Sequence, residues 1–534
     1  LKPDAVTTLL INANYTLGLS DDNRLSEVMS QNNKLGPLST GDILQGNGAK
    51  TYYYRHSVAF TRLSRTKKGR RYTIYHNLDI NNRFNDNSTL TDMRFLYPTT
   101  YDSTAAQLRE ERIPRTDANV SFNFTEPLSK RFSFRVSGRY EYGQLHNDIS
   151  TFGKTPGGPG FDVPLPDLTS QFKRISNRVF VAPGIEFKWK GLSITPTLRA
   201  LMQHVDNNLA GKQSIRQRQN DLLPGLAIVY KRLSFNYNRD VTLPWYSYLI
   251  PVNDNTNPYY INKGNADLLP STRDNISANF SHNDTKRNLN FNLHANGSFT
   301  QNDVVQSTVV DEKGVQTMMP VNADGSRNFY VYFNLYKQYK NRQKFIFSWN
   351  TGGNYNFNRN RLLYNGESSW QSTFNFNNWV GINLNWNDKV EWNSSYSLGF
   401  NFTRYTSEQF SALKIQNTWW ENELVLRWPK HVIWETQCAY SYSSNVPPGT
   451  PKDIVRWNAA INFTMLNNEA GVLKLSAFDL LNQNLAISSY ANRNMITLSQ
   501  TNALSQYFMA TFTYNVRPAG MKKKVGGRER LFFF

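Results

Sequence analysis

Few residues of this 534-residue chain have the types and the spacing that catalysis requires. Its seven histidines are scattered, and its single cysteine, Cys438, can form neither an intrachain disulfide nor a thiolate metal cluster. His294 lies among asparagines on an expected strand, where it would face water, and a hydrolase that uses it is a third functional alternative. No phosphate-binding glycine loop, nucleophile-elbow serine or metal-spaced His and Cys cluster is present. We therefore expect no enzyme, no cofactor and no metal site.

The chemistry that the sequence does offer is recognition by aromatic rings. Between residues 243 and 270, five rings follow one another closely: Trp245, Tyr246, Tyr248, Tyr259 and Tyr260. Exposed rings supply contact area at a low cost in side-chain entropy. We therefore treat these five as candidate contact residues of an external stacking surface for a ligand or a partner lipoprotein.

The same stretch also carries residues that shape turns, namely Asn257, Pro258, Gly264, Asn265 and Pro270. Asn, Pro and Gly adopt or fix the backbone angles that tight turns need. The structural interpretation is that they pin one long loop against its neighbour. It competes with the binding interpretation of the rings, and the sequence leaves both open.

The elements that must position this loop are long strands with a period of two. In residues 131–142, Phe132 and Phe134 alternate with Arg131 and Arg135, which gives one apolar face and one charged face. The same alternation recurs at residues 72–80, 179–189, 192–198, 289–300, 390–402 and 455–465. Strands of soluble sheets average about five or six residues, whereas crossing a bilayer at a tilt takes about 9 to 11. The longer runs match the second length.

Short and long connections alternate along the chain, as they do in outer-membrane barrels. Short turns are predicted near residues 67–70, 126–130, 190–191, 231–232, 284–287, 340–344, 387–389, 429–431 and 467–470. Long polar loops are predicted near residues 20–50, 85–112, 143–171, 242–271, 306–325 and 482–502. The pattern indicates about 20 strands, the first near Val6 and the last ending near Val516, and an even number puts both ends on the periplasmic side.

Composition and charge favour a membrane barrel over other classes. Aromatic residues make up 14% of the chain, yet the mean hydropathy is −0.58 and no run of about 18 apolar residues could form a membrane helix. Much of the formal net charge of +20 sits at the short turns and in residues 517–534, where it suits anionic headgroups. A nucleic-acid groove needs basic and aromatic residues on one continuous surface. We expect outer-membrane lipid, and no nucleic acid, as a partner.

The run NPYYINKGNADLLPS at residues 257–271 resembles the hallmark loop of the outer-membrane β-barrel family that forms the barrels of TonB-dependent (SusC/RagA-like) receptors. That hallmark is Asn-Pro, a few residues, Gly-Asn-Pro and a Leu-x-Pro entry to the next strand. Ala266 departs from it, because the family usually has proline there. The runs LSAFDLLNQN from Leu475 and ALSQYFMATFTYN from Ala503 are similar to the family's last two strands. The resemblance covers essentially the whole chain, as the barrel portion only.

The resemblance implies an all-β fold, a large transmembrane antiparallel β-barrel of about 20 to 22 strands with short periplasmic turns and long extracellular loops. We assign residues 1–516 to this barrel and residues 517–534 to a basic periplasmic C-terminal tail. Receptors of the family also have an N-terminal plug and a segment that contacts TonB, and neither is found before Val6. We expect both upstream of Leu1, where they would reach a periplasmic energy-coupling protein.

Two functions fit these expectations. The first is uptake, in which a TonB-dependent receptor-like barrel imports a ligand that is too large or too scarce for porins. The second is a structural or interaction subunit of a larger envelope complex, for secretion or surface-protein assembly. A plug and a TonB-contacting stretch in the precursor would favour uptake, and their absence would favour the scaffold. An Asn-rich interior and an aromatic loop suit glycans, peptides and metal chelates alike, so the ligand stays open.

Overall fold

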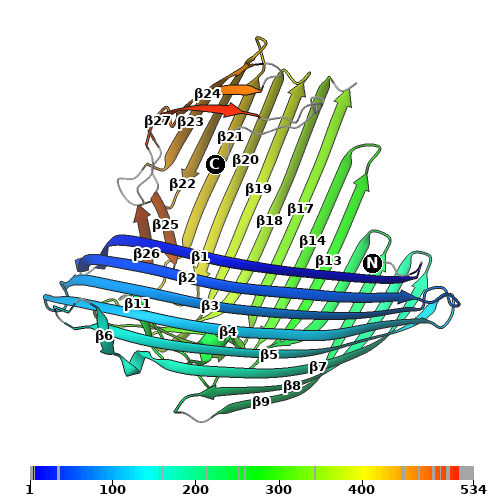
Figure 1. The fold of residues 1–534 in the computed structure, drawn as a ribbon, viewed down its shortest axis with the longest axis horizontal. Helices are drawn as coiled ribbons and strands as arrows, with labels where there is room; N and C mark the ends of the chain where they lie inside the picture. Colours follow the sequence, from blue (N-terminus) through cyan, green and yellow to red (C-terminus); the bar gives the residue numbers. More distant parts are fainter. Residues whose placement is uncertain are drawn as a thin grey trace. The chain divides into compact units, whose positions relative to one another are not determined.

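The computed structural model describes residue 4 and residues 6–32, 36–155, 157–158, 160–211, 214–250, 252–257, 260–341, 344–446, 451–466, 470–483, 487–492, 495–500 and 505–515. The tail assigned to residues 517–534 lies outside this set. Of the 27 described strands, 25 belong to one sheet and two form a separate hairpin (Figure 1). The chain divides into two compact units. Unit 1 comprises Leu1–Ala278, Asn296–Asn328 and Arg359–Trp370, and unit 2 comprises Asn279–Ala295, Phe329–Asn358 and Gln371–Phe534.

Long strands follow one another along the chain as antiparallel neighbours. Unit 1 contains β1 (Thr7–Asn32), β2 (Gly36–Leu63), β3 (Arg71–Phe95), β4 (Tyr101–Pro127), β5 (Phe132–Lys154), β7 (Ser170–Trp189), β8 (Leu192–Leu209), β9 (Ile215–Tyr230) and β10 (Leu233–Thr242). Five strands run through both units: β13 (Ser271–Asp284), β14 (Leu289–Gln301), β17 (Ser326–Asn341), β18 (Phe345–Tyr364) and β19 (Glu367–Trp386). Unit 2 contains β20 (Val390–Tyr405), β21 (Leu413–Leu426), β22 (Val432–Ser443), β23 (Asp453–Met465), β24 (Gly471–Phe478) and β27 (Tyr507–Tyr514).

Shorter elements occupy the connections. They are β6 (Phe161–Pro164), the 3₁₀ turn η1 (Pro166–Leu168), the helical turn α1 (Tyr246–Leu249), β11 (Asp254–Asn257), β12 (Tyr260–Asn262), β15 (Asp303–Val310), β16 (Gln316–Ala323), β25 (Ile487–Asn492) and β26 (Met495–Gln500). No described helix has the length and apolar character that crossing a membrane requires. The all-β antiparallel fold predicted from the sequence is confirmed.

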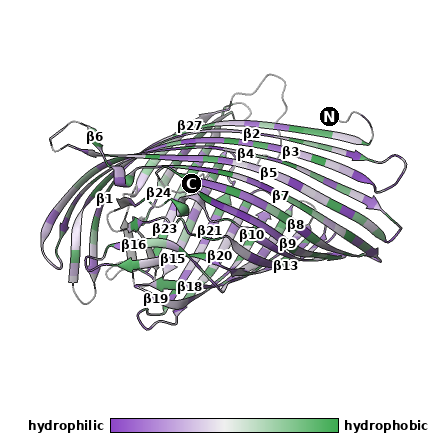
Figure 2. Ribbon diagram, turned by 90° about the horizontal axis from the view of Figure 1, so that it is seen from below, coloured by the Kyte–Doolittle hydropathy of each residue, from purple (hydrophilic) through white to green (hydrophobic). Residues whose placement is uncertain are grey.

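Residues of unit 1 alternate between an apolar face and a polar face. On β5, Phe132 is exposed on the apolar face, whereas Arg139 and Glu141 form an ion pair on the other. The register carries this alternation to the neighbours, since Glu141 stands opposite Asn119 of β4 and Arg178 of β7. Figure 2 shows hydrophobic and hydrophilic bands following one another along these strands. We call the polar side the inner face, because an apolar side of this composition suits lipid.

The short turns lie where the sequence places them. Between β7 and β8, Lys190 and Gly191 have φ angles of 43° and 85°, as a two-residue hairpin turn requires at both central positions. An equally short turn, residues 231–232, joins β9 to β10, and a three-residue turn, residues 387–389, joins β19 to β20. Because barrels of this kind have their short turns on the periplasmic side, this end of the strands is the periplasmic rim.

Two of the predicted long loops are wrong. Residues 20–50 and 85–112 continue as hairpins, because β1 extends to Asn32 before β2 begins at Gly36, and β3 extends to Phe95 before β4 begins at Tyr101. The ladder is unbroken through polar pairs such as Asn47 with Asn87. Backbone hydrogen bonds hold a ladder together whatever the side chains, so polar composition beyond the bilayer does not end a strand.

A small core fastens the outer ends of these hairpins. Ile43, Met93 and Phe95 are buried in it, and the Phe95 ring stacks on Tyr101 with their centroids 4.9 Å apart. Lys313, in the turn between β15 and β16, donates to the Tyr101 hydroxyl at 2.9 Å. A hairpin that comes much later in the chain is therefore attached to the ends of β3 and β4.

Unit 2 has its own polar network on the inner face. Lys474 Nζ lies 3.2 Å from Glu435 Oε2, and both side chains are nearly buried, at 12% and 4% exposure. Asn462 Nδ2 donates to the other carboxylate oxygen, Oε1, at 2.9 Å. Asn383 and Asn393 hydrogen-bond to each other on β19 and β20. Buried charge is thus paired and hydrogen-bonded, which is the condition for keeping it out of water.

Candidate functional site

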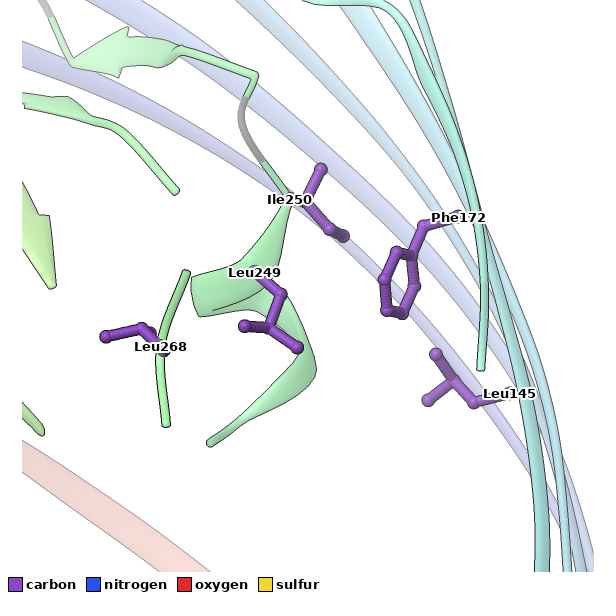
Figure 3. Close-up of a cluster of buried hydrophobic side chains, with 5 residues drawn as sticks. All are labelled: Leu145, Phe172, Leu249, Ile250 and Leu268. Atoms are coloured by element: carbon purple, nitrogen blue, oxygen red, sulfur yellow. The ribbon is translucent and has the colours of Figure 1, made fainter. Parts of the chain in front are cut away.

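We use the name wall for the long strands of the sheet. The connection between β10 and β13, residues 243–270, folds back onto the wall, and we call it the folded loop. Leu249 and Ile250, at the end of α1, meet Leu268 from the returning chain and pack against Leu145 and Phe172 of the wall (Figure 3). None of the five is more than 6% exposed. Burying each such side chain stabilises the packed state by about 1.5 to 3 kcal/mol. The described residues of the folded loop are therefore an ordered part of unit 1.

The folded loop lies on the inner face. Leu145 is an even number of residues from Glu141 along β5, and Phe172 is an even number from Arg178 along β7, so their side chains share the face of that ion pair. Gln217 of β9 reaches the loop from the same face, because its Nε2 donates to the Leu268 carbonyl at 3.0 Å. Apolar packing here fills a gap in an otherwise polar surface.

Three arginines of the wall hold the chain where it enters the folded loop. Arg199 Nη2 donates to the Arg239 carbonyl at 2.7 Å, and Arg178 Nη2 to the Val241 carbonyl at 2.8 Å. Arg174 Nη1 donates to the Pro244 carbonyl at 3.2 Å. Hydrogen bonds from charged donors are about twice as strong as neutral ones. The three guanidinium groups thus fix the path of the backbone as it leaves β10.

Gly264 and Asn265 lock the middle of the folded loop. A Cβ at Gly264 would lie 1.9 Å from the carbonyl oxygen of Ile250, so the backbone can approach this closely only at glycine. The Asn265 amide donates to the Tyr248 carbonyl at 2.5 Å, and its Nδ2 donates to the Pro320 carbonyl at 3.0 Å. One asparagine therefore ties α1 to β16.

Two further asparagines hold the chain as it returns to the wall. Asn322 Oδ1 accepts the Leu269 amide at 2.8 Å, and its Nδ2 donates to the Leu269 carbonyl at 3.0 Å. Asn302 Nδ2 donates to the Pro270 carbonyl at 2.9 Å. A side-chain amide carries both a donor and an acceptor, so it can substitute for a neighbouring strand. These two residues lie outside the loop, and the sequence alone does not predict their role.

The structure separates the candidate contact rings. Trp245 is 58% exposed and Tyr248 is 37% exposed, whereas Tyr246 is half-buried against the apolar cluster. Burial raises the pKa of the Tyr246 hydroxyl, and the Glu111 carboxylate acts in the same direction. Tyr260 is half-buried on β12, beside Gln316 of β16. Only Trp245 and Tyr248 of these four offer much free ring surface.

Three other residues of the folded loop, Asn257, Pro258 and Tyr259, are described only in part or not at all. Asn257 ends β11, and its backbone pairs with that of Tyr260. Pro258 and Tyr259 lie outside the described residues. The role of the rings in binding and the role of the turn residues in pinning one long loop against its neighbour stay predictions.

Beside the folded loop, charged side chains line a cavity of about 610 Å³ on the inner face of unit 1. Arg139 lies 2.9 Å from Glu141, and Arg115 lies 2.5 Å from Asp117. Further lining residues include Tyr53, Arg55, Asp79, Arg178, Gln203 and Leu243. Because opposite charges alternate along this wall, the cavity is strongly polar without a large net charge. It can hold water or a polar ligand.

The charged face of residues 131–142 is predictable from the sequence, but the partners of its side chains are not. Arg178 lies 3.7 Å from both Glu141 and Asp240, on strands that are far apart in the chain. Arg199 lies 3.2 Å from the same Asp240. Alternating charge on neighbouring strands was the only local signal, and it does not say which strands meet.

The residues first considered for catalysis have ordinary surroundings. His294 contacts Asn279, and its ring centroid lies 6.1 Å from that of Tyr330. Cys438 is half-buried on β22 opposite Trp457. Within the part of the chain that the structure describes, no three His, Cys, Asp or Glu side chains form a group that could hold a metal ion.

Comparison with known proteins gives a family and distant structural likenesses. No curated protein matches the chain. The FrpB iron transporter from Neisseria meningitidis (F3-3 variant) is 11% identical over 96% of this chain and 82% of its own, with a TM-score of 0.33. The outer membrane transporter YddB from Escherichia coli is 8% identical over 89% and 75%, with a TM-score of 0.32. The siderophore receptor PirA from Pseudomonas aeruginosa is 10% identical over 97% and 82%, with a TM-score of 0.34.

The family rests on a different observation, and the three likenesses add nothing to it. The sequence pattern of the outer membrane protein beta-barrel family matches residues 66–390, which is more than half of the chain. The match runs from the turn before β3 to the start of β20 and includes the folded loop. The chain therefore belongs to the outer membrane protein beta-barrel family and is a protein of the outer membrane.

Proposed function

We propose that this outer-membrane barrel takes up a ligand across the outer membrane in the manner of a TonB-dependent receptor. The observation that carries the proposal is the folded loop, which packs on the inner face next to a polar cavity of about 610 Å³. A path for a hydrated ligand needs polar walls, and a loop fixed beside that path can meet the ligand. A barrel that only anchors partners needs neither feature.

Within this proposal, Trp245 and Tyr248 make the first contact with the ligand. Both rings are exposed, while the backbone that carries them is held by Arg174 and Asn265. Holding exposed rings on an ordered backbone lowers the entropy cost of binding. Tyr259 and Tyr260 are kept as candidate contact residues in the proposal.

The proposed partners follow from the same mechanism. Import against a concentration gradient needs energy. In this proposal, nucleotide hydrolysis at the outer membrane does not supply it. A periplasmic energy-coupling protein would act through an N-terminal part of the receptor. A surface lipoprotein would close over the aromatic side of the folded loop.

An unbiased depletion experiment tests uptake without knowledge of the ligand. Cells that produce the full protein and cells that lack it are grown in the same complex medium, and mass spectrometry measures which solutes disappear. We expect at least one solute to be depleted only when the protein is present, and a protonophore to abolish that depletion. Replacing both Trp245 and Tyr248 by Ala should slow the depletion by about tenfold, the loss typical of aromatic anchors.

Trp189→Ala is the matched control, because Trp189 is also an exposed ring, at 49%, but lies at the periplasmic rim. It should leave depletion unchanged. The scaffold alternative predicts that no solute depends on the protein and that the barrel copurifies with envelope partners in fixed proportion. That pair of results would overturn the uptake proposal.

A further inference from the structure

The apolar face of unit 2 carries a groove close to the periplasmic rim. Across six strand pairs, the register aligns one row of apolar residues on this face: Trp386, Val390, Leu426, Trp434, Ile461, Leu475 and Ala510. The intervening residues of the same strands, such as Glu435 and Lys474, belong to the inner polar network. The row therefore faces lipid. Its strands β22 to β24 and β27 are labelled in Figure 1.

Small residues make this part of the lipid face concave. Ala459, Ala477 and Ala510 lie on three neighbouring strands, β23, β24 and β27, and line a cavity of about 760 Å³. Trp434 lines the same cavity at 49% exposure and Phe508 at 73% exposure. Ligand pockets in proteins commonly enclose about 300 to 1,000 Å³. A belt that only contacts bulk lipid does not need such a hollow.

The groove continues to the rim and ends at a cation. A second cavity, of about 480 Å³, shares Leu426 and Trp434 with the first and is also lined by Trp386, Trp428 and Lys389. Lys389 lies in the turn between β19 and β20 and is exposed. It has no ion-pair partner among the residues that the structure describes. An apolar groove thus leads to an ammonium group that is available to an anion.

The indoles at this end add hydrogen-bond donors. Trp386 is 61% exposed and Trp428 is 71% exposed, and both line the rim cavity. Amphipathic indole rings favour the level of the headgroups, where the N–H group can meet phosphate or ester oxygens. By contrast, Trp457 deeper in the groove donates its Nε1 hydrogen to Thr436 Oγ1 at 2.8 Å. Polar chemistry is therefore available at the rim and satisfied within the groove.

We propose that this groove binds one anionic glycerophospholipid of the periplasmic leaflet. An acyl chain would lie over Ala459 and Ala477, and the phosphate would pair with Lys389. The occupant is chosen by charge and by polarity together: the lining is apolar where a chain would lie and cationic where a headgroup would lie. An extended peptide would leave its backbone groups unsatisfied in the apolar part. The site is separate from the inner face. The proposal therefore does not depend on which ligand the barrel transports.

Native mass spectrometry of the full protein in detergent tests this site with phosphatidylglycerol as the anionic probe and phosphatidylcholine as the zwitterionic one. The wild type should bind one phosphatidylglycerol more tightly than phosphatidylcholine. Lys389→Gln should weaken phosphatidylglycerol binding about fivefold, the effect of one lysine beside an anionic headgroup. It should weaken phosphatidylcholine binding less, because the choline cation offsets the charge of the phosphate. The control is Lys190→Gln, because Lys190 is another rim lysine, 5.3 Å from the Trp189 ring centroid, outside the two cavities.

Two substitutions test the acyl-chain part. Ala477→Leu fills the groove and should weaken both lipids, whereas Ala200→Leu on the lipid face of β8 should weaken neither. If Ala477→Leu lowers the yield of folded barrel, Phe508→Ala opens the side of the groove instead and should also weaken both lipids. The proposal is overturned if Lys389→Gln behaves like Lys190→Gln, or if the groove substitutions behave like Ala200→Leu. Either result would mean general lipid contact without a site.

Discussion

Leu268 is the residue whose truncation should most directly release the folded loop from the inner face. It is 1% exposed and packs with Leu249, Ile250 and Phe172. Truncation of buried leucine to alanine costs about 2 to 5 kcal/mol. Because the strands of the wall do not depend on this cluster, we expect the cost to fall on local opening of the loop. A change of about 1.4 kcal/mol is tenfold, so opening should become about 30-fold to a few thousand-fold more frequent.

Amide hydrogen exchange in detergent measures this opening. The amide of Asn265 donates to the Tyr248 carbonyl and that of Leu269 to Asn322 Oδ1, so both should lose protection in Leu268→Ala. Peptides from the wall strands should exchange as in the wild type. Leu269→Ala is the matched control, since that neighbour is 57% exposed and its truncation should change opening by less than about 0.5 kcal/mol. Equal exchange in the two variants would refute the packing account of the loop.

Three further predictions use other contacts. Gly264→Ala should also release the folded loop, measured by the same exchange, because its Cβ would meet the Ile250 backbone. Lys474→Met should lower the free energy of unfolding of the barrel by about 3 to 5 kcal/mol, because Glu435 then stays buried without its cation. Adding Glu435→Gln should recover much of this loss, and a thermal melting experiment measures both changes. Hydrogen bonds from Thr155 lower the pKa of Asp162 from its usual 3.8, so the carboxylate stabilises its turn above that value and the effect disappears as the pH falls through the lowered pKa. Exchange of the Thr155 amide should accelerate in that acid range, beyond the intrinsic trend, and Asp162→Asn should remove the pH dependence.

The wall was predictable from the sequence because lipid imposes a period on it. Alternation such as that at Phe132 and Phe134 identifies a face, and a pair such as Lys190 and Gly191 marks a turn. Beyond the bilayer this constraint ends, so the sequence pattern does not predict the strand extensions through residues 20–50 and 85–112. Ile43 and Met93 were the local hint, since buried apolar residues in a polar stretch indicate a second small core.

The candidate site was predictable only in part. The Gly264 and Asn265 run marks the folded loop from local turn chemistry. The arginines that hold it, Arg174 and Arg178, are 70 and 63 residues before the carbonyls that they bind. Such partners follow from the order of strands in the sheet, and a single sequence does not state that order.

The length of β1 to β4 affects how easily proteases outside the cell can cleave this region. Strands of 26 and 28 residues, as in β1 and β2, extend for about 86 and 92 Å at about 3.3 Å per residue, while the apolar band of such barrels is only about 25 Å tall. Much of each strand therefore lies in water, yet its backbone groups are already hydrogen-bonded to the neighbouring strands. Proteases act on peptide segments that can be pulled free into an extended form. Digestion of intact cells should consequently cleave this region only at hairpin tips such as residues 96–100 and leave the long strands uncut.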